Sequence, residues 1–363
     1  MVNLRIPGPT PVPDEVLQAM AKQMINHRGP EFKELMNDVT AKLKTVFQTK
    51  NDVLTLTAAG TGGLEAAIVN TLSPGDKVLA TSIGVFGDRF TKIAQTYGAD
   101  VTPLNFEWGK AADVNAIRKA LQADPKIKAV LVTQNETSTG VTNDLAAICP
   151  VVKEFDKLLL VDAISGLGAI DLPVDKWHCD VTVTGSQKAW MVPPGLTMVS
   201  VSEEAWQAHA EAKMPRFYFD FSKAKSNLEK GQTPWTPAVS IIFALQVALD
   251  MILKEGLANV FARHIRVAKA ARDGIKSLGL SLFADERYVS ETVTPVVAPP
   301  GLDVKAMLKI LREAHQVVLA GGQQDLSGKI FRIGHLGWVT EKDIAGVISA
   351  LKVALPQAGF AGG

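Results

Sequence analysis

The sequence predicts an α/β protein in which a mostly parallel, seven-stranded sheet forms a large domain and a smaller C-terminal α+β domain follows it. Two observations support this fold class. Short β-branched runs alternate with helical patterns over the first two hundred residues, and beyond Ser202 a polar, aromatic-bearing stretch gives way to long helices. Strand, helix and strand at this spacing are typical of parallel units whose sheet carries helices on both faces.

The seven strands are interspersed with periodic helical segments. Strands are expected at 53–58, 78–82, 100–106, 129–134, 158–163, 181–186 and 197–202. Helices are expected at 63–72, 86–98, 113–122 and 144–155. Only the turn formed by Pro193, Pro194 and Gly195 separates the last two strands, which favours an antiparallel seventh strand.

The remaining sequence predicts the smaller domain. Helices are expected at 237–256, from there to about 278, near 304–314 and at 341–355, with short extended segments at 281–286, 292–299, 316–322 and 329–337. We divide the chain into an N-terminal arm (1–20), a large domain (21–255) and a small C-terminal domain (256–363).

Composition and charge exclude several function classes. The 38 basic and 37 acidic residues leave a formal charge of +1, which argues against a nucleic-acid-binding surface or a polybasic membrane contact. Only Cys149 and Cys179 occur, so no disulfide framework is expected.

The N-terminus has no secretory pattern, and the most apolar stretch (239–253) falls short of the ~20 residues of a membrane span. We expect a cytoplasmic protein without a nucleic-acid partner, a membrane partner or a bound metal.

Ligands of a doubly wound sheet bind at the carboxyl ends of the strands, and the first such loop is rich in glycine. Gly60, Thr61, Gly62 and Gly63 lead into a helix, whose free N–H groups and dipole favour a phosphate. A plain turn capped by Thr61 explains the motif equally well. A nicotinamide site fits poorly, because the third glycine of the fingerprint is misplaced and the next strand ends without an acidic residue.

Two charged residues follow later strands. Asp162 ends the apolar run LLLVD, and Lys188 follows VTVTGSQ. Alone, the first is most simply a loop hydrogen bonder and the second a surface charge. Together with a phosphate cradle they supply what pyridoxal 5′-phosphate needs: an anion site, a partner for the pyridine nitrogen and an amine for the Schiff base.

These residues carry a family resemblance. The run 158–196, with VDA, GSQKA and PPG at characteristic spacing, and PGPTPVP near the start resemble the class V, fold-type I aminotransferases of the alanine–glyoxylate and serine–glyoxylate group. The resemblance extends over residues 5–355.

The resemblance implies a cofactor role for residues of the strand-end loops. Lys188 corresponds to the Schiff-base lysine and proton shuttle, and Asp162 to the partner of the pyridine nitrogen. The other implied cofactor contacts are Gly60, Thr61 and Gly62 at the phosphate, Phe86 stacked on the ring, Thr137 near the phenolic oxygen, and Gln187 beside the lysine. Phe86 stands where the family usually has tryptophan, so the face contact remains but the indole N–H is absent.

The resemblance also implies substrate contacts and a shared site. Arg332 corresponds to the anchor of the substrate carboxylate, for which a guanidinium is geometrically suited. Gly8 and Thr10 would line the substrate mouth. The segment GQTPWTP resembles a loop that reaches the phosphate of the partner subunit, with Gln232, Thr233 and Thr236 as the candidates. A homodimer with shared active sites is therefore expected.

The expected activity is ping-pong transfer of an amino group from alanine or serine to glyoxylate. The alternatives are another pair, with aspartate or phosphoserine as donor and pyruvate or 2-oxoglutarate as acceptor, and a non-catalytic relative that binds the cofactor. A cysteine desulfurase is set aside because it needs a nucleophilic cysteine well after the lysine, and none follows Cys179.

Overall fold

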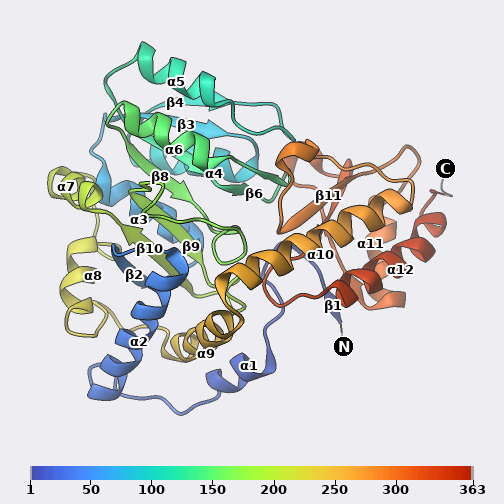
Figure 1. The fold of residues 1–363 in the computed structure, drawn as a ribbon, viewed down its shortest axis with the longest axis horizontal. Coiled ribbons are helices and arrows are strands. Elements are labelled where there is room, and N and C mark those ends of the chain that lie inside the picture. Colours follow the sequence, from blue (N-terminus) through green and yellow to red (C-terminus); the bar gives the residue numbers. More distant parts are fainter. Residues whose placement is uncertain (1, 361–363) are drawn as a thin grey trace.

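The computed structural model describes residues 2–360, and its central feature is a seven-stranded sheet (Figure 1). In spatial order the strands are β2 (Asp52–Thr57), β10 (Leu196–Val201), β9 (Val181–Gly185), β8 (Leu158–Asp162), β5 (Ile127–Thr133), β3 (Lys77–Ser82) and β4 (Asp100–Asn105). Strand β10 runs antiparallel to both of its neighbours, and the other four pairings are parallel. The predicted sheet and its antiparallel seventh strand are confirmed.

Both faces of the sheet are buried, as the apolar runs of its strands require. Neighbouring residues such as Leu159 and Leu160 belong to different hydrophobic clusters, one on each face. One cluster joins the sheet to α1 (Asp14–Met20), α2 (Pro30–Phe47), α5 (Val114–Ala123), α6 (Leu145–Glu154) and α9 (Val239–Glu255). The other joins it to α3 (Gly60–Thr71), α4 (Val85–Thr96), α7 (Glu203–Glu211) and α8 (Phe221–Leu228).

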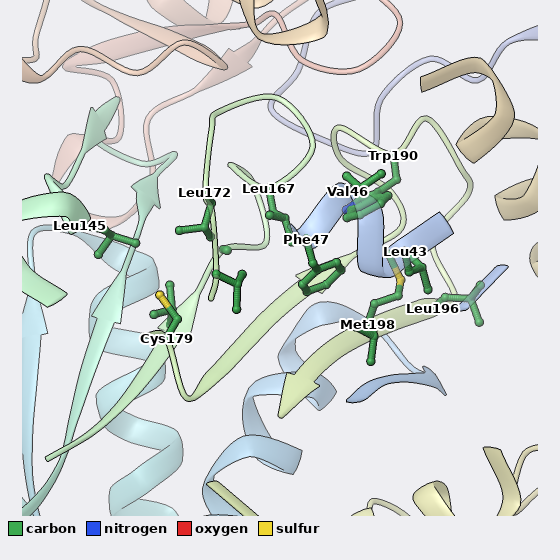
Figure 2. Close-up of a cluster of buried hydrophobic side chains, with 14 of the residues drawn as sticks. Leu43, Val46, Phe47, Leu145, Leu167, Leu172, Cys179, Trp190, Leu196 and Met198 are labelled. Atoms are coloured by element: carbon green, nitrogen blue, oxygen red, sulfur yellow. The ribbon is translucent and has the colours of Figure 1, made fainter. Parts of the chain in front are cut away.

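The first cluster fixes the loop that follows β9. Trp190 is fully buried and lies 5.8 Å from Phe47 of α2, measured between ring centroids (Figure 2). Its indole Nε1 donates to the Thr184 hydroxyl on β9 at 2.8 Å. The loop that carries residue 188 is therefore fixed two residues further along the chain by the buried Trp190 side chain.

A second, three-stranded antiparallel sheet lies beyond α10 (Leu257–Ser277), the long helix that leads away from α9 (Figure 1). Its order is β11 (Val293–Val297), β14 (Ile330–Gly334) and β13 (Ala320–Gly321). Helices α11 (Val304–His315) and α12 (Glu341–Gln357) share its separate hydrophobic cluster with α10. Segment 281–286 forms only one isolated bridge, between Leu282 and Val296, before the 3₁₀ turn Glu286–Tyr288.

Three short pairings and turns complete the fold. β1 (Asn3–Leu4) pairs in parallel with β12 (Val317–Val318), so the start of the chain lies against its C-terminal part. β6 (Asn135–Glu136) and β7 (Val141–Thr142) form a small hairpin, and a second 3₁₀ turn covers Gln324–Leu326. Within residues 2–360, every helix is too short or too polar to cross a bilayer.

Candidate active site

A cavity lies at the carboxyl edge of the large sheet, where six strands that run in the same direction end together. Its lining consists of Ala59, Gly60, Thr61, Leu64, Phe86, Arg89, Asn135, Thr137, Asp162, Ile164, Ser165, Gln187 and Lys188. The structure thus brings together seven of the residues predicted for the cofactor site, which the chain carries on five separate loops. Gly62 lies on α3 between Thr61 and Leu64 of this lining but is not part of it, and a Cβ on Gly62 would face Ala58 and Phe219 instead.

The glycine-rich loop presents a helix N-terminus to the cavity. Helix α3 begins at Gly60 itself, earlier than predicted, and the residue that precedes it is Ala59, which has no capping side chain. The alternative in which Thr61 caps the helix is therefore wrong. A Cβ on Gly60 would lie 2.6 Å from the Ile164 Cδ1, so any larger residue would require the Ile164 side chain to shift. The first-turn N–H groups of a helix have no intrahelical partners and favour an anion.

Asp162 and Lys188 are the ionisable pair of the cavity. Asp162 ends β8, is 3% exposed and accepts the Ile164 N–H at 3.0 Å. Burial raises the pKa of Asp162 to about 7, with a further increase from the charge of Glu136, against the opposing effects of this hydrogen bond and of Lys188. Burial likewise lowers the pKa of Lys188 to about 8, against the opposing charge of Asp162.

The N-terminal arm closes over Lys188. Its Nζ donates to the Pro7 carbonyl, and a Cβ on Gly8 would lie 2.7 Å from that nitrogen. Gly8 also has φ +117°, a conformation that L side chains rarely adopt. The Thr10 hydroxyl donates to the Lys188 carbonyl at 2.9 Å, and the Thr10 N–H to the Gln187 carbonyl at 3.1 Å. Gly8 and Thr10 therefore lie directly against the lysine.

Arg332 comes from β14 and is 6% exposed. Its Nη1 donates to the Thr137 carbonyl at 3.0 Å and to the Gln323 side chain at 3.1 Å, and its Nε to the Gly321 carbonyl at 2.9 Å. Burial lowers the pKa of Arg332 to about 10, opposed by the negative charge of Glu136. Among residues 2–360, Nη2 has no hydrogen-bond partner, so this nitrogen keeps its N–H donors for a ligand carboxylate, although Arg332 is not among the residues that line the cavity.

The residues predicted to serve the partner subunit lie outside the cavity. Thr233 and Thr236 line a separate cleft with Tyr218 and Trp235. Gln232 accepts a hydrogen bond from Arg28 Nη1 at 3.0 Å.

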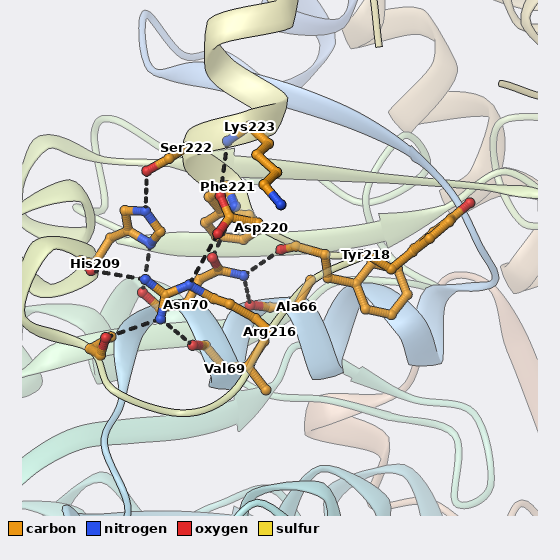
Figure 3. Close-up of polar contacts among 12 residues, drawn as sticks. Ala66, Val69, Asn70, His209, Arg216, Tyr218, Asp220, Phe221, Ser222 and Lys223 are labelled. Atoms are coloured by element: carbon orange, nitrogen blue, oxygen red, sulfur yellow. Dashed lines mark hydrogen bonds and ion pairs between the residues drawn. The ribbon is translucent and has the colours of Figure 1, made fainter. Parts of the chain in front are cut away.

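Two other arginines, Arg28 and Arg216, could pair with the second carboxylate of a dicarboxylate donor only if they lined the cavity, and neither does. Arg28 donates to the Thr233 carbonyl as well. Arg216 donates to the carbonyls of Val69 and Ala212 and pairs with Asp220 (Figure 3).

Sequence reasoning missed several residues around the cavity. Two of them, Asn135 and Glu136, belong to the segment NETSTG, from which only Thr137 was predicted. The Asn135 side chain donates to the hydroxyls of Ser165 at 2.8 Å and Thr292 at 2.9 Å. Arg89 lies one helical turn after Phe86, 4.7 Å from the centroid of its ring. The position of NETSTG after a strand was a usable signal, whereas nothing in the sequence singles out Arg89.

The donor set fits pyridoxal 5′-phosphate. A buried carboxylate, an amine with a lowered pKa and a helix N-terminus face one cavity, with an aromatic ring at its wall. Gln187 Oε1 is buried without a hydrogen-bond partner in the described residues, which leaves an acceptor for a ligand donor. A helix N-terminus, a carboxylate and an amine are the kinds of group that would hold the phosphate, the pyridine nitrogen and the aldehyde carbon of that cofactor.

Curated relatives cover nearly the whole chain. The soluble hydrogenase 42 kDa subunit of Anabaena cylindrica is 46% identical over 359 residues, which are 98% of this chain and 94% of that protein. The L-aspartate–glyoxylate aminotransferase of Paracoccus denitrificans is 38% identical over 98% of this chain and 91% of its own length. The serine–glyoxylate aminotransferase of Methylorubrum extorquens is 36% identical over 97% and 90%.

A solved structure and a family model agree with the two relatives that are named aminotransferases. The crystal structure of an alanine–glyoxylate aminotransferase from Nostoc sp. superposes with a TM-score of 0.94 at 31% identity, covering 98% of this chain and 95% of that one. The family model described as aminotransferase class V matches residues 2–334. The chain therefore belongs to the class V aminotransferases of fold type I, and it is a pyridoxal 5′-phosphate-dependent transaminase.

Proposed function

We propose that the protein transfers the amino group of a small amino acid, alanine or serine, to glyoxylate in two half-reactions at one site. The observation that carries this proposal is the placement of one buried guanidinium, Arg332, beside the cavity that holds Lys188 and Asp162. The one guanidinium nitrogen without a partner in the described residues, Nη2, matches the single carboxylate that alanine, serine and glyoxylate share. Relatives named for aspartate–glyoxylate and serine–glyoxylate transfer support glyoxylate as the acceptor.

Each residue of the cavity has a physical task in this proposal. Pyridoxal 5′-phosphate, when bound, supplies the electron sink for the substrate Cα–H bond. Lys188 would take the proton from that Cα and deliver it to the carbon of the cofactor that carried the aldehyde, a role suited to an amine with a pKa of about 8. Asp162 keeps a proton on the pyridine nitrogen, and Gly60 and Thr61 donate to the phosphate. Phe86 covers one face of the ring.

The remaining residues orient cofactor and substrate. Thr137 and Gln187 contact the oxygen substituents of the cofactor, with Gly62 one residue further along the phosphate-binding turn. The backbone at Gly8 lies so close to Lys188 that a side chain on Gly8 would overlap with the lysine. Gly8 and Thr10 therefore limit the room above Lys188. That restriction favours small donors.

A donor with a second carboxylate, such as aspartate, is the alternative that a specific observation favours. Arg89 is exposed, lines the cavity and affects the pKa values of both Asp162 and Lys188. Phosphoserine has less support, because Arg28 and Arg216 are engaged outside the cavity.

A half-reaction screen separates these substrates. The cofactor-loaded protein is mixed with alanine, serine, aspartate or phosphoserine while the cofactor absorbance is followed, and each acceptor is then added in turn. We expect alanine and serine to react fastest and glyoxylate to reverse the change most efficiently. A preference for phosphoserine with 2-oxoglutarate would contradict the proposal, and Lys188→Ala protein, which lacks the proton-transferring amine, serves as the inactive control.

We also propose a homodimer in which Gln232, Thr233 and Thr236 contact the phosphate bound by the partner subunit. Exposed apolar side chains lie near these residues: Phe217 is 69% exposed and stacks on Trp235 at 5.0 Å between ring centroids. The segment that carries Phe217 is not loosely attached. The Arg216 guanidinium donates to the Val69 carbonyl on α3, and the Asn70 side chain on α3 donates to the Phe219 carbonyl and accepts the Phe221 N–H of α8 (Figure 3). A rigid, apolar surface of this kind favours association.

Two further points of organisation are proposed. The division into an arm, a large domain ending at 255 and a small domain is supported by Gly256, which has φ 83° between α9 and α10. The outer limits of that division, Met1 and residues 361–363, lie outside the described residues.

A cytoplasmic location is supported by two free, buried cysteines.

A further inference from the structure

Glu136 is a fully buried carboxylate that lies beside the cavity but does not line it. Its Oε2 accepts the N–H groups of Phe86 at 3.0 Å and Gly87 at 3.1 Å, at the start of α4. Its Oε1 accepts the Ser138 N–H at 3.0 Å and the Ser138 hydroxyl at 2.6 Å. Each carboxylate oxygen thus accepts two hydrogen bonds. An ionised carboxylate suits this arrangement, because it only accepts hydrogen bonds.

The contacts with α4 replace a missing helix cap. The N-cap position of α4 is Gly84, which has no side chain to accept the first-turn N–H groups. Glu136 accepts two of them from a position fifty residues later, and the Ser138 hydroxyl accepts the Val85 N–H at 3.0 Å. A Cβ on Gly84 would lie 2.6 Å from Glu136 Cγ, so the glycine permits this close approach. The backbone of Phe86 is therefore fixed by the β6–β7 hairpin.

The same hairpin also holds the substrate anchor. The residue after Glu136 is Thr137, whose carbonyl accepts the Arg332 Nη1 at 3.0 Å. The charge of Glu136 also acts on Arg332 from within the protein interior. Glu136 and its neighbour in sequence thus contact both the proposed ring-stacking residue and the proposed carboxylate anchor, which come from elements more than two hundred residues apart.

We propose that Glu136 is a positioning residue, a buried carboxylate that keeps the ring-stacking Phe86 and the carboxylate anchor Arg332 in register across the cavity. The proposal rests on the cofactor and substrate roles proposed above for those two residues. Glu136 itself touches neither ligand. It acts on the cofactor through the backbone of Phe86, and on the substrate through the Thr137 carbonyl.

Glu136→Gln tests the proposal with little change in shape. A glutamine side chain has one acceptor oxygen and an NH₂ group, and the NH₂ group would face N–H donors of either α4 or Ser138. One of the two contacts must open. We expect weaker cofactor binding by at least tenfold, a reduced circular dichroism of the bound cofactor, and a loss of kcat/KM of about 10²-fold, the effect of a misplacement of about 1 Å.

Asp180→Asn is the matched control. Asp180 is also a buried carboxylate, 2% exposed, that accepts a backbone N–H (from Leu159, at 2.7 Å) and a serine hydroxyl (from Ser202, at 3.1 Å), and it lies outside the cavity. We expect this variant to lower the free energy of unfolding while the cofactor dissociation constant and dichroism stay unchanged. Equal cofactor effects in the two variants would show that Glu136 contributes only general stability and would overturn the proposal.

A double-mutant cycle tests whether Glu136 acts through Phe86. If it does, Glu136→Gln changes the cofactor dissociation constant much less in a Phe86→Ala background, whereas fully additive changes contradict the mechanism. If Glu136→Gln fails to fold, the cycle is run with Ser138→Ala, which removes one donor to the carboxylate and the acceptor for Val85. Cofactor affinity and dichroism are measured without substrate, so the result is independent of whether glyoxylate is the acceptor.

Discussion

At the scale of the residue, Asp162 carries a charge that the cofactor-free fold disfavours. Its pKa of about 7 in the folded protein exceeds the ordinary value of 3.8, because burial outweighs its hydrogen bond and its positive neighbours. Between those two values the folded state binds more protons than the unfolded state, so stability falls as pH rises. Above pH 7 the buried carboxylate of Asp162 is ionised, and the loss of stability reaches its full size. A bound pyridinium would offset this unfavourable burial of the Asp162 charge. The charge that lowers the stability of the cofactor-free protein is thus the one that strengthens cofactor binding.

We predict that Asp162→Asn stabilises the cofactor-free protein while weakening its function. At pH 8 the variant should be more stable than the wild type by roughly 1–4 kcal/mol, and the difference should shrink towards zero near pH 4. Urea unfolding of both cofactor-free proteins at pH 4.5 and pH 8 measures this. The same variant should slow single-turnover proton abstraction far more than it weakens substrate binding. Equal stabilities at pH 8 would show that the buried charge has been misjudged.

At the scale of the element, helix α3 shows where reading the sequence succeeds and where it stops. The strands around it were predicted to within two or three residues, because runs buried on both faces are continuous and apolar. The start of α3 was missed because Gly60, Gly62 and Gly63 lower helix propensity, and only close tertiary packing, against the sheet at Gly63 and against loop residues at the other two, explains them. A Cβ on Gly63 would lie 2.2 Å from the Thr197 hydroxyl oxygen. Contacts such as Glu136 with Phe86, between residues far apart, leave no periodic signal at all.

Two glycine-to-alanine substitutions test this explanation. Gly63→Ala must push α3 away from β9 and β10, so we expect a loss of about 1–3 kcal/mol in the free energy of unfolding, together with weaker cofactor binding at the displaced helix N-terminus. Gly346→Ala on α12 is the control. Its Cβ would meet nothing closer than 3.5 Å, so the change should be neutral or stabilising by up to about 1 kcal/mol. Urea unfolding decides, and similar effects at both positions would refute the packing argument.

At the scale of the whole molecule, the N-terminal arm first pairs with the C-terminal part of the chain and then reaches the cavity. β1 pairs with β12, and the arm then crosses β14 so closely that a Cβ on Gly334 would lie 2.2 Å from the Ile6 carbonyl oxygen. The sequence predicted the arm at the substrate mouth but not this pairing, since two-residue strands have no pattern. The path ties the loop after β9, which carries Lys188, to strand β14 of the small sheet, which carries Arg332.

The proposed homodimer gives the last prediction. If each site needs Thr236 from the partner, Thr236→Glu subunits place a negative charge beside the phosphate of their neighbour, and Lys188→Ala subunits lack the essential amine. Both variants should be inactive alone. After subunit exchange in equal amounts, half of the dimers are hybrids with one intact site each, so activity should return to about a quarter of the wild-type value. A mixture of Lys188→Ala with the Lys188→Ala, Thr236→Glu double variant should regain nothing. No recovery in demonstrated hybrids, or full activity in a species that sediments as a monomer, would refute shared sites.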